Sequence, residues 1–111
     1  MNDNETYLRG LLNNAQNDYK AFAYEAILIG ATVSTLNIPD GARYAQLILE
    51  TTAVGTAVRM LRNKSVTITS LIGIPLENNA TIEIVDYSNL QGFQIIKVNP
   101  GTTTLHIEYF R

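Results

Sequence analysis

The sequence predicts a small all-β protein, an antiparallel β-sandwich of Ig-like or jelly-roll-like type, with an N-terminal helical or extended arm. Three observations predict this fold. Short apolar runs between residues 44 and 110 alternate with polar residues at period two, as half-buried strands do. Turn sequences such as Pro39-Asp40-Gly41 and Asn99-Pro100-Gly101 separate these runs. Strand patterns do not alternate with long helical patterns, which argues against a βαβ fold.

The clearest strands are the runs 44–52 and 103–110. Each places three apolar residues on one face. The other face holds Tyr44, Gln46, Ile48 and Glu50 in the first run and Thr104, His106 and Glu108 in the second. The apolar faces consist of Ala45, Leu47 and Leu49 in the first run and Leu105, Ile107 and Tyr109 in the second. We therefore expect these six side chains to point into the core.

Three further runs, 57–61, 81–87 and 93–98, are also predicted strands, with residues 88–92 as a connection. Asn99-Pro100-Gly101 lies between two apolar runs, which predicts a hairpin joining the last two strands. Residues 21–29 fit either a strand or a helix. Residues 66–74 are also ambiguous, and Gly73-Ile74-Pro75 is expected to be irregular.

The first residues have a different pattern. Leu8, Leu11, Leu12 and Ala15 recur at three- and four-residue spacing, which indicates an amphipathic helix. We divide the chain into an N-terminal arm, residues 1–36, with a short helix and the first strand, and a sandwich domain, residues 37–111. Two interpretations of the helix stand: it packs on its own domain, or it orders only on a partner chain.

Composition excludes several classes of function. The chain has 111 residues, a net charge of -2 and no cysteine, so disulfides and thiolate metal sites are excluded. Its eight basic residues form no cluster, which argues against nucleic-acid binding. The acidic N-terminus lacks a secretory n-region, and the most apolar stretch, residues 21–33, is too short and too mixed to span a bilayer. We expect no nucleic-acid or membrane partner.

No motif indicates catalysis, a cofactor or a metal site. His106 is the only histidine, and on a strand it would share a face with Thr104 and Glu108. A weak surface cation site is one interpretation of this face, and an ordinary solvated polar face is the one we favour. No nucleophile elbow or phosphate-binding loop occurs. A small hydrolase, with His106 and Asp86 as residues to test, is the least favoured hypothesis.

The predicted partner-interface residues are four arm residues and one arginine, namely Tyr7, Leu8, Leu11, Leu12 and Arg59. If residues 57–61 form a strand, Arg59 points away from the face shared by Val58 and Met60. A guanidinium suits an ion pair at an interface, so we consider this role for Arg59 beside that of an ordinary exposed arginine.

A series of short motifs between Ile38 and Phe110 resembles small β-sandwich virion proteins of tailed bacteriophages. The motifs include an Ala-Val-Arg strand at 57–59, Gly-Ile-Pro-Leu at 73–76 and a terminal strand ending Tyr109-Phe110. The matching segments, in order, are 38–45, 50–53, 57–59, 73–76, 90–96 and 101–110. The loop 63–69 departs from the group, because it lacks the glycine and the Pro-Thr pair that are common there.

This resemblance implies a non-enzymatic virion structural protein, made in the host cytoplasm and incorporated into the particle. The expected role is a capsid auxiliary or decoration protein that binds and stabilises the head shell. Its partners would be the major capsid protein or head-to-tail components, and self-association is left open. The alternative is a head-to-tail or tail-fibre accessory protein, including a carbohydrate- or receptor-binding module. The resemblance implies no catalytic residue and no cofactor.

Overall fold

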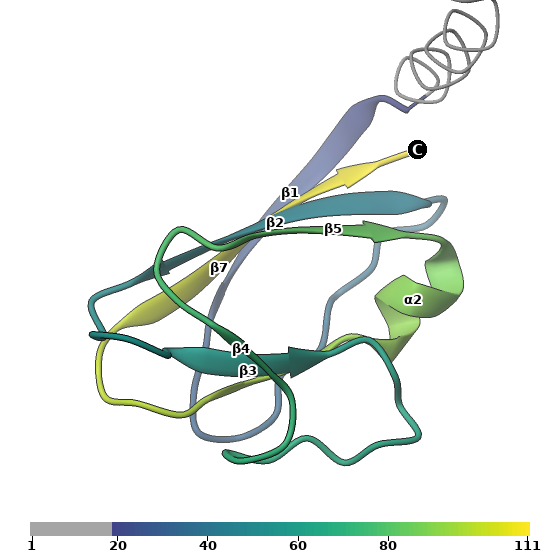
Figure 1. The fold of residues 1–111 in the computed structure, drawn as a ribbon. Coiled ribbons are helices and arrows are strands. Elements are labelled where there is room, and N and C mark those ends of the chain that lie inside the picture. The colour runs from purple at the N-terminus through teal and green to yellow at the C-terminus, as the bar shows by residue number, and fades with distance from the viewer. Residues whose placement is uncertain (1–18) are drawn as a thin grey trace, which may run out of the picture.

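The computed structural model describes residues 19–111, which form a β-sandwich of two antiparallel sheets (Figure 1). One sheet has four strands in the order β1 (Ala21–Leu28), β7 (Thr103–Phe110), β2 (Tyr44–Thr51) and β5 (Thr81–Val85). The other has three, in the order β4 (Ile74–Leu76), β3 (Val58–Leu61) and β6 (Gln94–Lys97). Helix α2 (Tyr87–Gly92) leads from β5 to β6. The all-β sandwich prediction is confirmed.

The strand order distinguishes between the two predicted sandwich types. Ser34 forms an isolated antiparallel bridge with Ile95 of β6, so a rudimentary strand extends the three-stranded sheet. If the Ser34 segment is counted as a second strand, the sheet orders become first-eighth-third-sixth and second-seventh-fourth-fifth. This is the strand order of a jelly roll, so the fold is the jelly-roll-like alternative.

The core lies between the two sheets and follows the predicted alternation. The inward residues of β2 and β7 are buried, namely Ala45, Leu47, Leu49, Leu105, Ile107 and Tyr109. The facing sheet contributes Val58, Met60 and Ile95, and Phe93 and Leu90 close the end beside α2. The period-two pattern therefore assigned the buried faces correctly, because β2 and β7 each have one face in the core and one outside it.

Strand β1 belongs to the four-stranded sheet. Residues from Ala23 to Leu28 pair with β7, with an irregularity between Ala21 and Ala23. Lys20 and Arg111 exchange both backbone hydrogen bonds at 3.0 Å and extend this pairing. The sheet therefore includes residues on the N-terminal side of the predicted domain boundary at residue 37.

The hairpin predicted at Asn99-Pro100-Gly101 is wrong. Strand β6 pairs with β3, whereas β7 lies between β1 and β2, so the turn connects the two sheets. Gly101 has a φ of 135°, and a Cβ there would lie 2.8 Å from the backbone nitrogen of Ala53. The turn residues allow the chain to reverse close to the neighbouring backbone. They do not determine which strands pair.

One other local prediction is also corrected. Ile74 and Pro75, expected to be irregular, lie in β4. Proline is tolerated there because β4 is an edge strand, where one side of the backbone needs no ladder partner. Residues 88–92 connect β5 to β6, as expected, and the structure adds that this connection is helical, as part of α2. Within residues 19–111, no helix is long and apolar enough to cross a membrane.

Candidate docking interface

The two sheets differ in what lies on their outer sides. A loop of residues 62–73 folds across the outer side of the three-stranded sheet, below it in Figure 1. Ile68 in this loop is only 3% exposed. A Cβ on Gly73 would lie 3.0 Å from the Cβ of Arg59 and 3.2 Å from a side-chain carbon of Ile68, so the loop packs closely on β3. This sheet is covered by its own chain.

Arg59 holds this loop in place. Its Nε donates to the carbonyl of Ser70 at 3.0 Å, and its Nη1 donates to the carbonyl of Gly73 at 2.7 Å. Gln94 on the neighbouring strand donates through Nε2 to the carbonyls of Asn63 and Val66. Hydrogen bonds from a charged donor are stronger than neutral ones, so the guanidinium is well suited to fix the loop. Arg59 thus points outward, as predicted, and bonds to its own chain.

The outer side of the four-stranded sheet is not covered by any described segment (Figure 1). Four apolar or aromatic side chains on it are strongly exposed: Tyr24 63%, Leu28 71%, Ile48 48% and Val85 46%. They come from three strands, β1, β2 and β5. We call the outward residues of these strands and of β7 the outer face, consisting of Tyr24, Ala26, Leu28, Tyr44, Gln46, Ile48, Glu50, Thr81, Glu83, Val85, Thr104, His106, Glu108 and Phe110.

His106 joins the strands across the middle of the outer face. Its Nδ1 lies 2.6 Å from the hydroxyl of Tyr24 on β1, and its Nε2 lies 3.2 Å from a carboxylate oxygen of Glu50 on β2. The Tyr24 and His106 rings also stack, with centroids 6.1 Å apart. A neutral ring that donates from Nε2 to Glu50 and accepts at Nδ1 from Tyr24 satisfies all three groups. The chain of bonds fixes Tyr24 in position across the sheet.

Aromatic rings gather where the outer face meets the start of the described chain. Tyr44 stacks with Tyr19 at 5.4 Å and meets Phe110 edge-on at 5.1 Å, while Arg43 lies over the Tyr19 ring. The Tyr44 hydroxyl accepts a hydrogen bond from Gln46. Burial, followed by the neighbouring Glu83, raises the pKa of Tyr44, and the bond from Gln46 partly opposes this rise. Tyr19 therefore packs on the sandwich.

A partly buried hydrogen bond connects β1 to β7 on the opposite, inner side of the sheet. The Tyr109 hydroxyl donates to Glu25 at 2.6 Å, and Asn37 donates to the other oxygen of the same carboxylate. Burial, followed by the hydrogen bond to Glu25 and its negative charge, raises the pKa of Tyr109. An inward-pointing carboxylate on an edge strand discourages a further strand from adding there.

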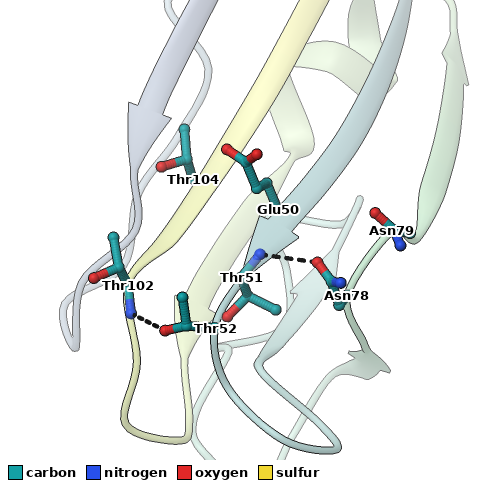
Figure 2. A pocket seen from close by; sticks show the side chains of 7 residues that line it. All are labelled: Glu50, Thr51, Thr52, Asn78, Asn79, Thr102 and Thr104. Atoms are coloured by element: carbon teal, nitrogen blue, oxygen red, sulfur yellow. Dashed lines mark hydrogen bonds between the residues drawn. The ribbon is translucent and has the colours of Figure 1, made fainter.

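A polar pocket lies where β2 ends and β7 begins, beside the outer face (Figure 2). It is lined by Glu50, Thr51, Thr52, Asn78, Asn79, Thr102 and Thr104. Figure 2 shows two of its polar groups bonded to neighbouring backbone: Asn78 Oδ1 accepts from the Thr51 amide, and Thr52 Oγ1 accepts from the Thr102 amide. No aromatic side chain lines it, so it offers no stacking platform for a sugar ring.

The Tyr24–His106–Glu50 arrangement has the residue types of a catalytic relay but not its surroundings. Tyr24 is mostly exposed, and the side chains of His106 and Glu50 are 35% and 73% exposed. Catalytic electrostatics depend on a site that excludes water, and this arrangement lies open on a sheet face. Thr104 and Glu108 share the outward face of β7 with His106, as predicted, and His106 bonds to Glu50 on β2. Within residues 19–111, no group of three or more acidic or histidine side chains could hold a metal ion.

Of the five predicted interface residues, only Arg59 lies in the part of the chain that the structure describes. Tyr7, Leu8, Leu11 and Leu12 lie outside the described residues. Arg59 lies on the covered side of the sandwich, away from the outer face. The exposed residues Tyr24, Leu28 and Ile48 were not singled out from the sequence. A signal for them existed, because each is an apolar residue at an outward position of an alternating strand.

Comparison with known proteins adds little. No protein-family model and no curated protein matches the chain. One solved structure is similar, described as "Bacillus endospore appendages form a novel family of disulfide-linked pili". The match has 15% sequence identity and a TM-score of 0.43, and it covers 82% of this chain and 85% of the other chain. A likeness at this TM-score supports no functional argument, so the proposals below depend on the chain itself.

Proposed function

We propose that this chain is a non-enzymatic structural module that docks into a larger assembly through its outer face. The observation that carries the proposal is the contrast between the two sheets. The loop 62–73 packs on the three-stranded sheet and buries Ile68, although its own Leu71 and Ile72 are exposed. On the four-stranded sheet, no described segment packs over Tyr24, Leu28 and Ile48. Several exposed apolar side chains on one sheet face that no described segment covers are consistent with an interaction site.

The assembly that we propose is a tailed-phage particle, with the chain as an auxiliary protein of the head shell. The support for this is the resemblance of residues 38–110 to virion β-sandwich proteins. The jelly-roll fold does not choose among functions by itself, because it occurs in capsid, lectin and cupin domains. In a decoration role, many copies on one lattice would make a modest interface durable.

A sugar-binding accessory role has less support. The polar pocket of Figure 2 has no aromatic lining, and the exposed Tyr24 is bonded to His106. An enzymatic role also has less support, because the Tyr24–His106–Glu50 arrangement is open to solvent. Neither alternative explains why the outer face is left apolar.

The test uses phage heads that are assembled without this chain and incubated with the purified protein. The variant Leu28→Ser/Ile48→Ser removes two exposed apolar side chains from the outer face. Val54→Ser is the matched control, because Val54 is 95% exposed but lies in the loop between β2 and β3. We expect the double variant to lose binding by about tenfold or more and the control to bind as wild type.

Removing residues 1–18 tests the arm separately. The cut keeps Tyr19, which stacks on Tyr44, and Lys20, whose backbone pairs with Arg111. We expect the shortened chain to remain folded and to lose head binding. Wild-type occupancy by the double variant would reject the outer face as the docking surface, and wild-type occupancy by the shortened chain would reject the arm. Failure of the wild-type protein to bind any head would reject the capsid role.

A further inference from the structure

The four strands that form the outer face carry no side chain with a permanent positive charge. The sequences of β1, β2, β5 and β7 contain neither lysine nor arginine. Their outward positions include three carboxylates, those of Glu50, Glu83 and Glu108. The seven basic residues of the described chain all lie outside these strands, at Lys20, Arg43, Arg59, Arg62, Lys64, Lys97 and Arg111.

Two of the three carboxylates have no cationic partner among the described residues. Glu50 bonds to His106, the one side-chain pair of opposite charge type within 4.0 Å in residues 19–111. Glu83 receives a weak bond from Gln46 at 3.4 Å. Arg62 donates to the backbone carbonyl of Glu83, at 3.4 Å. The outer face is therefore apolar in patches and acidic overall.

The register places the carboxylates among the apolar residues. Glu108 on β7 lies between Tyr24 on β1 and Gln46 on β2, and Glu83 on β5 follows Gln46. In the next outward row, His106 lies between Ala26 and Ile48. A partner that covers the apolar side chains must therefore also cover carboxylates, and a buried carboxylate needs a cation or hydrogen-bond donors.

A second copy does not satisfy this requirement by packing outer face on outer face. In such a contact neither copy supplies a lysine or arginine from these strands to pair with the carboxylates of the other. The chain's own residues 1–18 also fail the requirement. They carry three carboxylates, Asp3, Glu5 and Asp18, against the single guanidinium of Arg9.

We infer that the outer face binds a protein surface of a different kind, in which lysine or arginine side chains surround an apolar patch. The apolar part covers Tyr24, Leu28 and Ile48, and the basic part pairs with Glu83 and Glu108. Charge pairs of this kind speed association and fix the register of two surfaces. This inference rests on the proposed docking function and adds the chemistry of the partner.

The test titrates the full chain with three short synthetic peptides, followed by amide chemical shifts in NMR spectra. One peptide alternates leucine and lysine, one alternates leucine and glutamate, and one alternates serine and lysine. We expect the leucine–lysine peptide to shift amides of β1, β7 and β2 on the outer face, and the other two to bind at least about tenfold more weakly. Raising the salt from about 50 to about 300 mM should weaken the binding, because screening shortens the Debye length.

Charge variants distinguish this charge-dependent binding from non-specific hydrophobic binding. Glu83→Lys/Glu108→Lys should reduce binding of the leucine–lysine peptide by about tenfold, with Glu83→Gln/Glu108→Gln between it and wild type. Glu77→Lys is the matched control, an exposed carboxylate in the turn after β4, and should leave binding unchanged. Equal binding of the lysine and glutamate peptides, or shifts confined to the loop 62–73, would overturn the inference.

Molar mass measured by light scattering tests whether a second copy of the chain binds the outer face. A concentration-dependent dimer that Leu28→Ser/Ile48→Ser abolishes would overturn the inference in favour of a second copy. These readouts use no phage heads, so they fail or succeed independently of the capsid role. If the apolar double variant loses head binding while the charge variants keep it, the docking function stands and the basic partner is rejected.

Discussion

The two sheets of this sandwich differ in whether a segment of the chain packs on their outer sides. The three-stranded sheet is covered on its outer side by the loop 62–73, which buries Ile68 and is held by Arg59 and Gln94. The four-stranded sheet has comparable apolar residues on its outer side and no described cover. The loop leaves its own Leu71 and Ile72 exposed, so the difference between the sheets lies in whether a segment packs over the strands. We propose that a partner packs over the strands of the four-stranded sheet.

The largest expected effect is on the covered side. Ile68→Ala should destabilise the protein by about 2–3 kcal/mol, because it leaves a cavity under the loop. Ile48→Ala on the open side removes a side chain that is already 48% exposed and should cost far less. Urea unfolding of both variants measures the difference. Equal costs for the two would show that the loop does not cover its sheet in solution.

The next effect concerns Arg59. Arg59→Met removes two charged hydrogen bonds to loop carbonyls, and we expect a loss of about 1–2 kcal/mol. Amide exchange at Leu71 and Ile72 should accelerate, because the loop loses its anchor. Arg59→Lys keeps the charge but not the two-pronged geometry, and should recover little. If Arg59→Met is neutral for stability and exchange but abolishes head binding, Arg59 is an interface residue, as the sequence alone suggested.

A smaller, pH-dependent effect measures how much the bond between Tyr109 of β7 and Glu25 of β1 stabilises the four-stranded sheet. The pKa of Tyr109 is raised in the folded chain, mainly by burial, so its stabilising contribution is present below the unfolded tyrosine pKa of about 10 and is lost as pH rises beyond it. Tyr109→Phe should cost about 1 kcal/mol near neutral pH. It should also flatten the fall of the urea midpoint between about pH 9 and 11. The raised pKa of Tyr44 contributes in the same direction and remains in this variant. An equally steep fall in the variant would remove Tyr109 as its cause.

The smallest effect on stability is expected on the outer face itself. Tyr24→Phe removes the hydroxyl that bonds to His106 at the surface and should change stability by less than about 0.5 kcal/mol. Thermal unfolding checks this value. A much larger loss would mean that the Tyr24–His106–Glu50 chain serves the fold, and would weaken the case for an open docking face.

Sequence reasoning succeeded where a strand has one buried face. The alternation in β2 and β7 identified the inward residues, because burial and strand geometry share the same period. It failed at Asn99-Pro100-Gly101, because turn chemistry reports a reversal of the chain and not the sheet that each strand joins. It also missed the partners of Arg59, which are backbone carbonyls and carry no side-chain signature.

The candidate site was harder to predict than the fold. Tyr24 and His106 are 82 residues apart and meet only through the register of β1 against β7. An apolar residue at an outward strand position looks the same in sequence whether a loop covers it or solvent does. The cover of one sheet and the openness of the other depend on where the loop 62–73 folds, which local patterns do not contain.

The backbone bonds between Lys20 and Arg111 also decide how the sandwich responds to mechanical load. The two residues lie side by side at one end of antiparallel strands β1 and β7. Tension applied between them would break the hydrogen bonds of this pair one at a time, as a zipper opens, instead of shearing them together. Strand β1 would peel away from Lys20 toward Leu28.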